Sequence, residues 1–161
     1  MTGSPIRWGR LLPPDATDYR GARWPVAVLV VVNVIGTVRS LIHILATDSG
    51  AQSIASMNVH VAGGANIIDL LAQWGGAQLL EAIIIWVILA RYRGLVPLML
   101  LIVTLEQALR TAIGSYKPLV TARTPPGALS WVLLPFVAVT LIAALTTGHR
   151  RDRSPQEQTA R

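Results

Sequence analysis

The chain has 161 residues, of which 52% are hydrophobic and only 14% are charged, and its formal net charge is +6. An average soluble domain carries about 25% charged residues, so this composition leaves too little polar surface for a small soluble protein. The absence of cysteine excludes disulfides, thiolate metal sites and thiol catalysis. The basic side chains lie at the chain ends and in one short turn, which argues against a nucleic-acid partner.

Four apolar stretches are each long enough to cross a membrane, which takes about 20 mainly apolar residues. They cover residues 25–46, 70–90, 95–114 and 128–147. The sequence therefore predicts an all-α protein, a four-helix transmembrane bundle over residues 25–147. We expect residues 1–24 to form an irregular arm and residues 148–161 to form a disordered basic tail.

The basic residues orient the predicted bundle. Ten of them lie before the first stretch, in the turn at 91–94 or after the last stretch, whereas only Lys117 and Arg123 lie in the other two connections. The positive-inside rule then places both termini and the 91–94 turn in the cytoplasm. The sequence therefore predicts a multi-pass protein of the cell membrane. A soluble helical bundle is the alternative, and it would make this asymmetry an accident.

The connections between the stretches predict three local features. The short turn at 91–94 predicts that the second and third helices form a tight antiparallel hairpin. A short helix at the membrane interface is expected over residues 52–61, with Gly63 and Gly64 as a break before the second span. Pro135 is expected to kink the last helix.

Four charged residues lie inside the predicted spans, and their formal charges sum to zero: Arg39, Glu81, Glu106 and Arg110. A charge at the bilayer centre costs about 2.5–3.5 kcal/mol on insertion scales, so such residues normally face the bundle interior and find partners. At about 100° per residue, each shares one arc of its helix with other polar groups. All lie in the outer half of the predicted bundle, which predicts a polar cavity there.

These groups leave several alternatives open. Glu106 and Arg110 are four residues apart and can neutralise each other on one helix, and Arg39 and Glu81 can form a purely structural pair between helices. His43 can be a hydrogen-bonded core histidine, and the two tryptophans within the second span can be packing residues. No nucleotide, zinc or serine-hydrolase motif occurs, so neither a metal nor a cofactor is expected.

Between Trp74 and Pro126 the chain carries the segments WGGAQLLEA, RYRGLVP, LEQALR and TPPG. In these segments it resembles small four-span bacterial membrane proteins of the broad DoxX-like kind, many of which have no assigned function. The resemblance implies a four-helix bundle in a bacterial cytoplasmic membrane. In the type of its polar groups, the chain is also similar to membrane-embedded cyclases and isomerases of terpenes or sterols, which use acidic residues on transmembrane helices to protonate an alkene or epoxide.

One hypothesis is a cofactor-free cyclase or isomerase that acts by general acid catalysis on a lipophilic substrate. Glu81 is the preferred acid, because no basic residue lies three or four positions away on its helix, and Glu106 is the second candidate. The expected substrate-binding residues are Trp74 and Trp86, which could stabilise a carbocation through their ring faces, and Gln78, Gln107 and His43, which would orient the substrate or the acid.

Two other hypotheses compete with the enzyme. The chain can be a non-catalytic accessory or lipid-binding subunit, in which Arg39 and Arg110 serve only structural ion pairs. It can also be a proton-coupled carrier, which would need a homo-oligomer because four spans without repeats make a poor alternating-access device. In every case the expected partner is a membrane lipid or a lipophilic small molecule.

Overall fold

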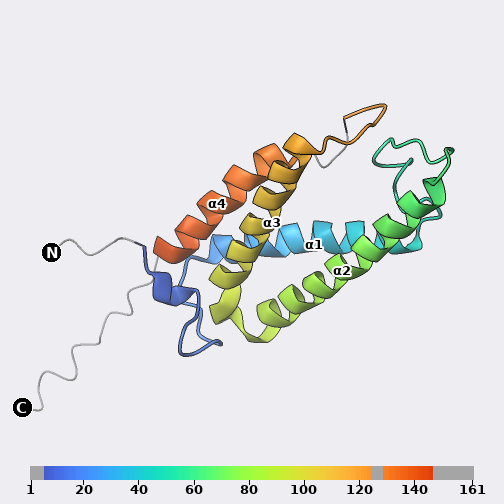
Figure 1. The fold of residues 1–161 in the computed structure, drawn as a ribbon. Coiled ribbons are helices and arrows are strands. Elements are labelled where there is room, and N and C mark those ends of the chain that lie inside the picture. The colour runs from blue at the N-terminus through green and yellow to red at the C-terminus, as the bar shows by residue number, and fades with distance from the viewer. Residues whose placement is uncertain (1–5, 125–128, 147–161) are drawn as a thin grey trace, which may run out of the picture.

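The structure is a computed structural model that describes residues 6–124 and 129–146. It contains four α-helices, α1 (Arg23–Leu45), α2 (Gly64–Arg91), α3 (Val96–Tyr116) and α4 (Ser130–Thr146), and two short 3-10 helices, η1 (Trp8–Arg10) and η2 (Arg93–Leu95) (Figure 1). No strand occurs in these residues, so the expected all-α fold with four helices is confirmed. The predicted tail at 148–161 lies outside the described residues.

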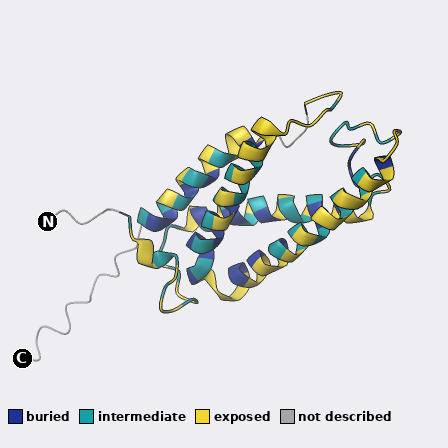
Figure 2. Cartoon of the chain, viewed as in Figure 1, coloured by how far each residue is buried: buried dark blue, intermediate teal, exposed yellow. Residues whose placement is uncertain are grey.

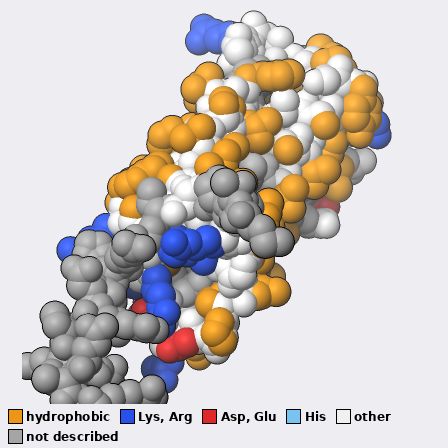
Figure 3. Space-filling view, turned by 90° about the vertical axis from the view of Figure 1, so that its left-hand side faces the viewer, with side chains coloured by type: hydrophobic (Ala, Val, Ile, Leu, Met, Phe, Trp, Pro, Cys, Tyr) orange, Lys and Arg blue, Asp and Glu red, His pale blue; other side chains and the backbone are white. Residues whose placement is uncertain are grey.

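Three of the four helices are suited by length and composition to cross a membrane. These are α1, α2 and the segment from Arg93 to Tyr116, with mean hydropathies of 2.1, 1.4 and 1.5. Helix α4 is also apolar but has 17 residues. Apolar side chains cover much of the face drawn in Figure 3, and Lys and Arg side chains lie near the end that carries the N-terminal arm as well as at the top and right edges of the view. This surface supports a membrane protein.

The helices pack as two pairs. Helix α1 runs along α2 and α3 runs along α4, whereas α2 and α3 diverge from the turn that joins them (Figure 1). The expectation that α2 and α3 form a tight hairpin is therefore wrong. The backbone of the N-terminal arm packs against their turn, where the Gly94 amide donates to the Ala16 carbonyl over 2.7 Å.

The hydrophobic core lies at one end of the molecule, beside the α2–α3 turn (Figure 2). It combines the first half of α1, the second half of α2, the first half of α3 and the second half of α4. Its buried members are Leu29, Ile85, Ile88, Leu89, Val96, Met99, Leu100, Val103, Val137 and Ala144. The two helix pairs are thus joined by apolar packing at this end and separate toward the other.

The arm before α1 is docked onto the core end. The Arg10 guanidinium donates to the Ala144 carbonyl over 3.1 Å, and the Arg7 amide donates to the Leu145 carbonyl over 3.4 Å. Tyr19 packs against the core and donates to the Ala22 carbonyl. Apart from η1 the arm is irregular in conformation, as expected, yet it is held at both of its ends by the bundle.

The connection between α1 and α2 contains no helix, so the helix expected over residues 52–61 is wrong. The Asp48 carboxylate instead accepts hydrogen bonds from the backbone amides of Gly50, Gln52 and Ser53 and folds the chain into consecutive turns. Helix α2 begins at Gly64 rather than near residue 70, directly after Gly63, whose φ of 85° is in the left-handed region that favours glycine.

Helices α1 and α2 approach most closely at Gly75. A Cβ atom there would lie 2.5 Å from the His43 Cβ and 3.1 Å from the Ser40 carbonyl oxygen. At Gly76, one residue along, a Cβ atom would meet nothing within 4 Å. Only the first glycine of this pair is therefore required by helix packing.

We expect Gly75→Ala to destabilise the protein by about 1–3 kcal/mol, because the added methyl group would meet the α1 backbone, which cannot move independently. Gly76→Ala is the matched control, since it makes the same chemical change in open space and should be neutral or slightly stabilising. Reversible unfolding in detergent measures both free energies. Equal free energies of unfolding for the two variants would contradict this packing.

Candidate functional site

A groove lies between the two helix pairs and has a volume of about 110 Å³. We call it the polar groove, and all four helices contribute to it. Its polar lining residues are Asn33, Arg39, Ser40, Gln78, Glu81, Glu106, Gln107 and Arg110, and its other lining residues are Val32, Ile35, Gly36, Ala82, Ile85, Val103 and Leu133. All four charged residues of the predicted spans therefore line one site.

Hydrogen bonds between side chains connect three helices across this groove. Arg39 on α1 donates from Nη2 to Oε1 of Gln78 over 2.8 Å. Gln78 on α2 donates from Nε2 to Oε1 of Glu106 on α3 over 3.2 Å. An amide can accept and donate at once, so Gln78 joins a cation on one side to an anion on the other.

Glu106 is also bound by Arg110, one turn further along α3. The Nε and Nη2 atoms of Arg110 donate to Oε1 of Glu106 over 3.0 and 2.6 Å. The two side chains are 19% and 29% exposed, which makes this ion pair partly shielded from solvent. The i,i+4 pair that the spacing allowed is therefore present, whereas Arg39 contacts Gln78 and not Glu81, its alternative partner.

Glu81 occupies a different position in the polar groove. It is partly buried on α2, one turn after Gln78. Among the described residues, no hydrogen bond or ion pair of its carboxyl group is found. The groove thus contains two different carboxyl groups. That of Glu106 accepts hydrogen bonds from two neighbouring side chains, and that of Glu81 has no hydrogen-bond or ion-pair partner among the described residues.

Trp74 lies beside the groove, against its two arginines. The guanidinium carbons of Arg39 and Arg110 lie 4.8 and 4.7 Å from the centroid of the Trp74 ring, at cation–π distance. The His43 ring lies 5.2 Å from it, tilted by 46°. Trp74 therefore contacts cations of the protein itself, which differs from the expected contact with a substrate carbocation.

His43 and Trp86 do not line the groove. His43 is buried, and its Nδ1 lies 2.6 Å from the Ser49 carbonyl oxygen, so its environment is that of a hydrogen-bonded core histidine. Trp86 donates from Nε1 to Thr37 Oγ1 over 3.1 Å, across the contact between α1 and α2. Gln107 does line the groove, together with the four charged residues of the predicted spans.

The turns after α1 hold His43 in place, which the sequence did not indicate. Hydrogen bonds from the Ser53 amide above all, and from the Gly50 and Gln52 amides, outweigh the opposing effect of burial and lower the pKa of Asp48 from 3.8 to about 2. Its carboxylate therefore stays ionised at any physiological pH and keeps the turns closed. Ser49, in the middle of these turns, presents its carbonyl to His43 and thereby connects this loop to the groove through Trp74.

No group of side chains in the described part of the chain is suited to hold a metal ion. Among known proteins, no family, no curated sequence and no solved structure matches this chain. The geometry of the groove is consequently the basis for any functional conclusion.

Proposed function

We propose that the chain is a multi-pass protein of the cell membrane in which α1 to α4 all cross the bilayer. Both termini and the α2–α3 turn then lie in the cytoplasm. The apolar flanks of the helices and the ten basic residues at the ends and the turn support this topology. The core end is then the cytoplasmic end, and the polar groove lies in the outer half of the membrane.

Cysteine labelling tests this topology cleanly because the chain has no cysteine of its own. We expect a membrane-impermeant maleimide added to intact cells to label Ala122→Cys, an exposed position between α3 and α4. It should not label Pro14→Cys, an exposed position in the arm, until the cells are opened. The reverse pattern would refute the topology and the depth assigned to the groove.

We infer that the polar groove is the site of a cofactor-free cyclase or isomerase that acts on a lipophilic, terpenoid or sterol-like substrate. The observation that carries this proposal is the contrast between the two carboxyl groups of the groove. Both partners of Glu106, Arg110 and Gln78, donate hydrogen bonds to its carboxyl group, whereas Glu81 has no such partner in the described residues. A general acid must hold a transferable proton, so Glu81 is the proposed donor.

The reaction balances without a cofactor. Glu81 would transfer its proton to an alkene carbon or an epoxide oxygen, and the cation formed would close a ring or move along the substrate. An adjacent carbon of the substrate would then lose a proton to the Glu81 carboxylate, which restores the acid. The structure favours no role for Trp74 in stabilising this cation, because its ring already contacts Arg39 and Arg110.

The size of the groove limits how the substrate would bind. A volume of about 110 Å³ accepts only the reacting end of a terpenoid. Ile35 and Leu133 line the groove and are 62% and 40% exposed, so the rest of the molecule would lie along them in the bilayer. Among the neutral polar residues of the groove, Gln78 and Gln107 are those proposed to orient an epoxide or hydroxyl oxygen.

The same small volume favours a second candidate, a non-catalytic lipid-binding or accessory subunit. In that case the Arg39–Gln78–Glu106–Arg110 network stabilises the bundle, and the groove holds part of a lipid without converting it. The resemblance to DoxX-like proteins is compatible with either function and stays a prediction. The proton-coupled carrier also stays a prediction.

Two isosteric variants separate these roles. We expect Glu81→Gln to keep folding, expression and any co-purifying lipophile but to abolish its conversion, since the amide has no transferable proton. Glu106→Gln should instead lower the free energy of unfolding by about 1.5–3 kcal/mol, the range for a hydrogen bond to a charged group. This is less than the roughly 3–5 kcal/mol of a broken buried ion pair, because the pair is partly exposed.

The measurement is purification of the full chain followed by mass spectrometry of the extracted lipophile, before and after incubation. Conversion by the natural chain and not by Glu81→Gln would support the enzyme. Full conversion by Glu81→Gln, or failure of that variant alone to fold, would show that Glu81 is not the acid. A bound lipid that neither protein converts would favour the accessory function.

A further inference from the structure

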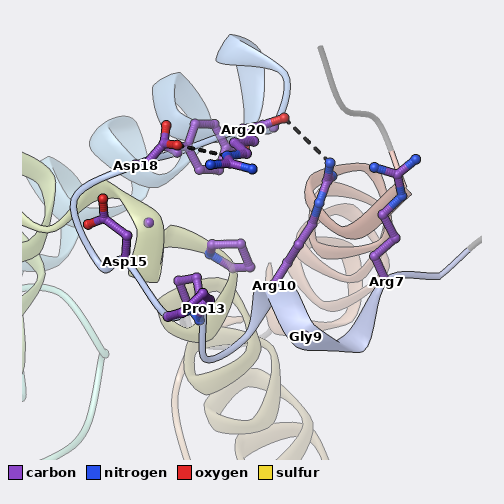
Figure 4. Close-up of a pocket in the computed structure, with 12 residues that line it drawn as sticks. Arg7, Gly9, Arg10, Pro13, Asp15, Asp18 and Arg20 are labelled. Carbon is purple, nitrogen blue, oxygen red and sulfur yellow. Dashed lines mark hydrogen bonds and ion pairs between the residues drawn. The ribbon is translucent and has the colours of Figure 1, made fainter. Parts of the chain in front are cut away.

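A second cavity of about 260 Å³ lies at the core end, between the N-terminal arm and the α2–α3 turn (Figure 4). We call it the arm pocket. It is larger than the polar groove and shares no lining residue with it. Its charged lining residues are Arg7, Arg10, Asp15, Asp18 and Arg20, and they come from the arm alone.

Apart from Arg20, which pairs with Asp18, the charges of the arm pocket are arranged by sign. Arg7 and Arg10 lie on the side formed by η1, and Asp15 and Asp18 lie on the opposite side, beyond the bend at Pro13 (Figure 4). Arg10 is fixed by its hydrogen bonds to the end of α4 and to the Arg20 carbonyl. Partial burial and the repulsion from the neighbouring charge of Arg7 lower the pKa of Arg10. An anion beside these two cations would therefore be stabilised.

The acidic side is preorganised in a different way. Oδ1 of Asp15 accepts hydrogen bonds from the amide and the hydroxyl of Thr17 over 2.8 and 2.7 Å, and these bonds lower the pKa of Asp15. Asp18 is paired with Arg20 over 2.7 Å. Within the described residues Asp15 has no such ion pair, so its negative charge is the one that a bound cation would meet.

The position of the pocket indicates where its ligand comes from. Trp8 and Leu12 on the same arm are 62% and 74% exposed, and an exposed tryptophan beside basic residues is typical of the headgroup region of a membrane. In the proposed topology the arm pocket lies at the cytoplasmic surface of the bilayer. The inference below rests on that topology but not on the chemistry of Glu81.

We propose that the arm pocket binds a phosphoethanolamine group, with its phosphate at Arg7 and Arg10 and its primary ammonium at Asp15. Guanidinium groups bind phosphate through charge-assisted hydrogen bonds, and an ammonium group donates to a carboxylate in the same way. A choline group has no N–H to donate, and a glycerol headgroup has no cation. The pocket therefore distinguishes the headgroup of phosphatidylethanolamine from those of phosphatidylcholine and phosphatidylglycerol.

The test is native mass spectrometry of the full chain released from nanodiscs that contain equal parts of these three phospholipids. We expect phosphatidylethanolamine to be retained about two- to fivefold over each of the others, which is the range for one exposed ion pair. Asp15→Asn should remove the preference over phosphatidylcholine, because asparagine keeps the Oδ1 acceptor for Thr17 and loses only the charge. Arg7→Gln should weaken the retention of all three.

Two controls make the same charge changes outside the pocket. In Asp69→Asn the changed residue lies on α2, far from the arm. In Arg91→Gln it lies at the same end of the molecule as the arm pocket but does not line the pocket. Both should retain phospholipids as the natural chain does. Equal retention of the three lipids by the natural chain, an unchanged preference in Asp15→Asn, or the same loss in Arg91→Gln as in Arg7→Gln would overturn the proposal.

Free O-phosphoethanolamine distinguishes the two sources of this group. Displacement of the lipid only at large excess supports the membrane lipid as the ligand, and displacement at equal concentration supports a soluble ligand at the same site. Retention of phosphatidylethanolamine by Glu81→Gln would support this site whatever the function of the polar groove. Loss of that retention in Glu81→Gln would contradict the independence of the two sites and overturn the assignment to the arm pocket.

Discussion

The side chain of Gln78 joins the two helix pairs where the molecule has no hydrophobic core, beside the contact of Arg110 on α3 with Trp74 on α2. The two helix pairs share apolar packing beside the α2–α3 turn and separate beyond it. In the open part, the Gln78 amide accepts from Arg39 and donates to Glu106, and thereby connects α1 to α3. An unpaired charge in hydrocarbon would cost several kcal/mol, so this chain of hydrogen bonds fixes the separation of the pairs as well as their charges.

The molecule therefore has one end packed around the hydrophobic core and one end where the helix pairs separate around polar side chains. Ten buried apolar residues pack the core end, and the docked arm covers it. Of the ten buried core residues only Ile85 and Val103 line the polar groove, and regions with few buried apolar contacts open at lower free energy than cores. This difference is consistent with the proposed function, in which the polar groove admits a lipophilic molecule from the bilayer beside Glu81.

Much of this organisation follows from helical periodicity. The apolar stretches predict the helices, and the cost of intramembrane charge predicts that Arg39, Glu81, Glu106 and Arg110 share one site. Periodicity could not choose between Gln78 and Glu81 as the partner of Arg39, because both lie on the same arc of α2. It also could not show that the Trp74 ring is occupied by two guanidinium groups, since that depends on the angle between the helix pairs.

The remaining errors have local causes. Residues 52–61 have no helix, and the Asp48 carboxylate instead organises the residues after α1 into turns, a local interaction that hydropathy does not register. The arm docks at the turn from which α2 and α3 diverge, and its Ala16 carbonyl lies so close to Gly94 that no side chain would fit there. A turn of four residues predicted neighbouring helices, but in the structure α2 packs along α1 and α3 packs along α4.

The most direct test of this account is a double-mutant cycle between Gln78 and Glu106. Gln78→Ala, Glu106→Ala and the double variant would be unfolded reversibly in detergent, and their free energies of unfolding compared with that of the natural chain. Residues joined in one hydrogen-bond network couple by about 0.5–3 kcal/mol. The free energy lost in the double variant should therefore be smaller than the sum of the two single losses by that amount. Strict additivity would show that Gln78 does not connect the helix pairs, and would contradict the structure proposed for the groove.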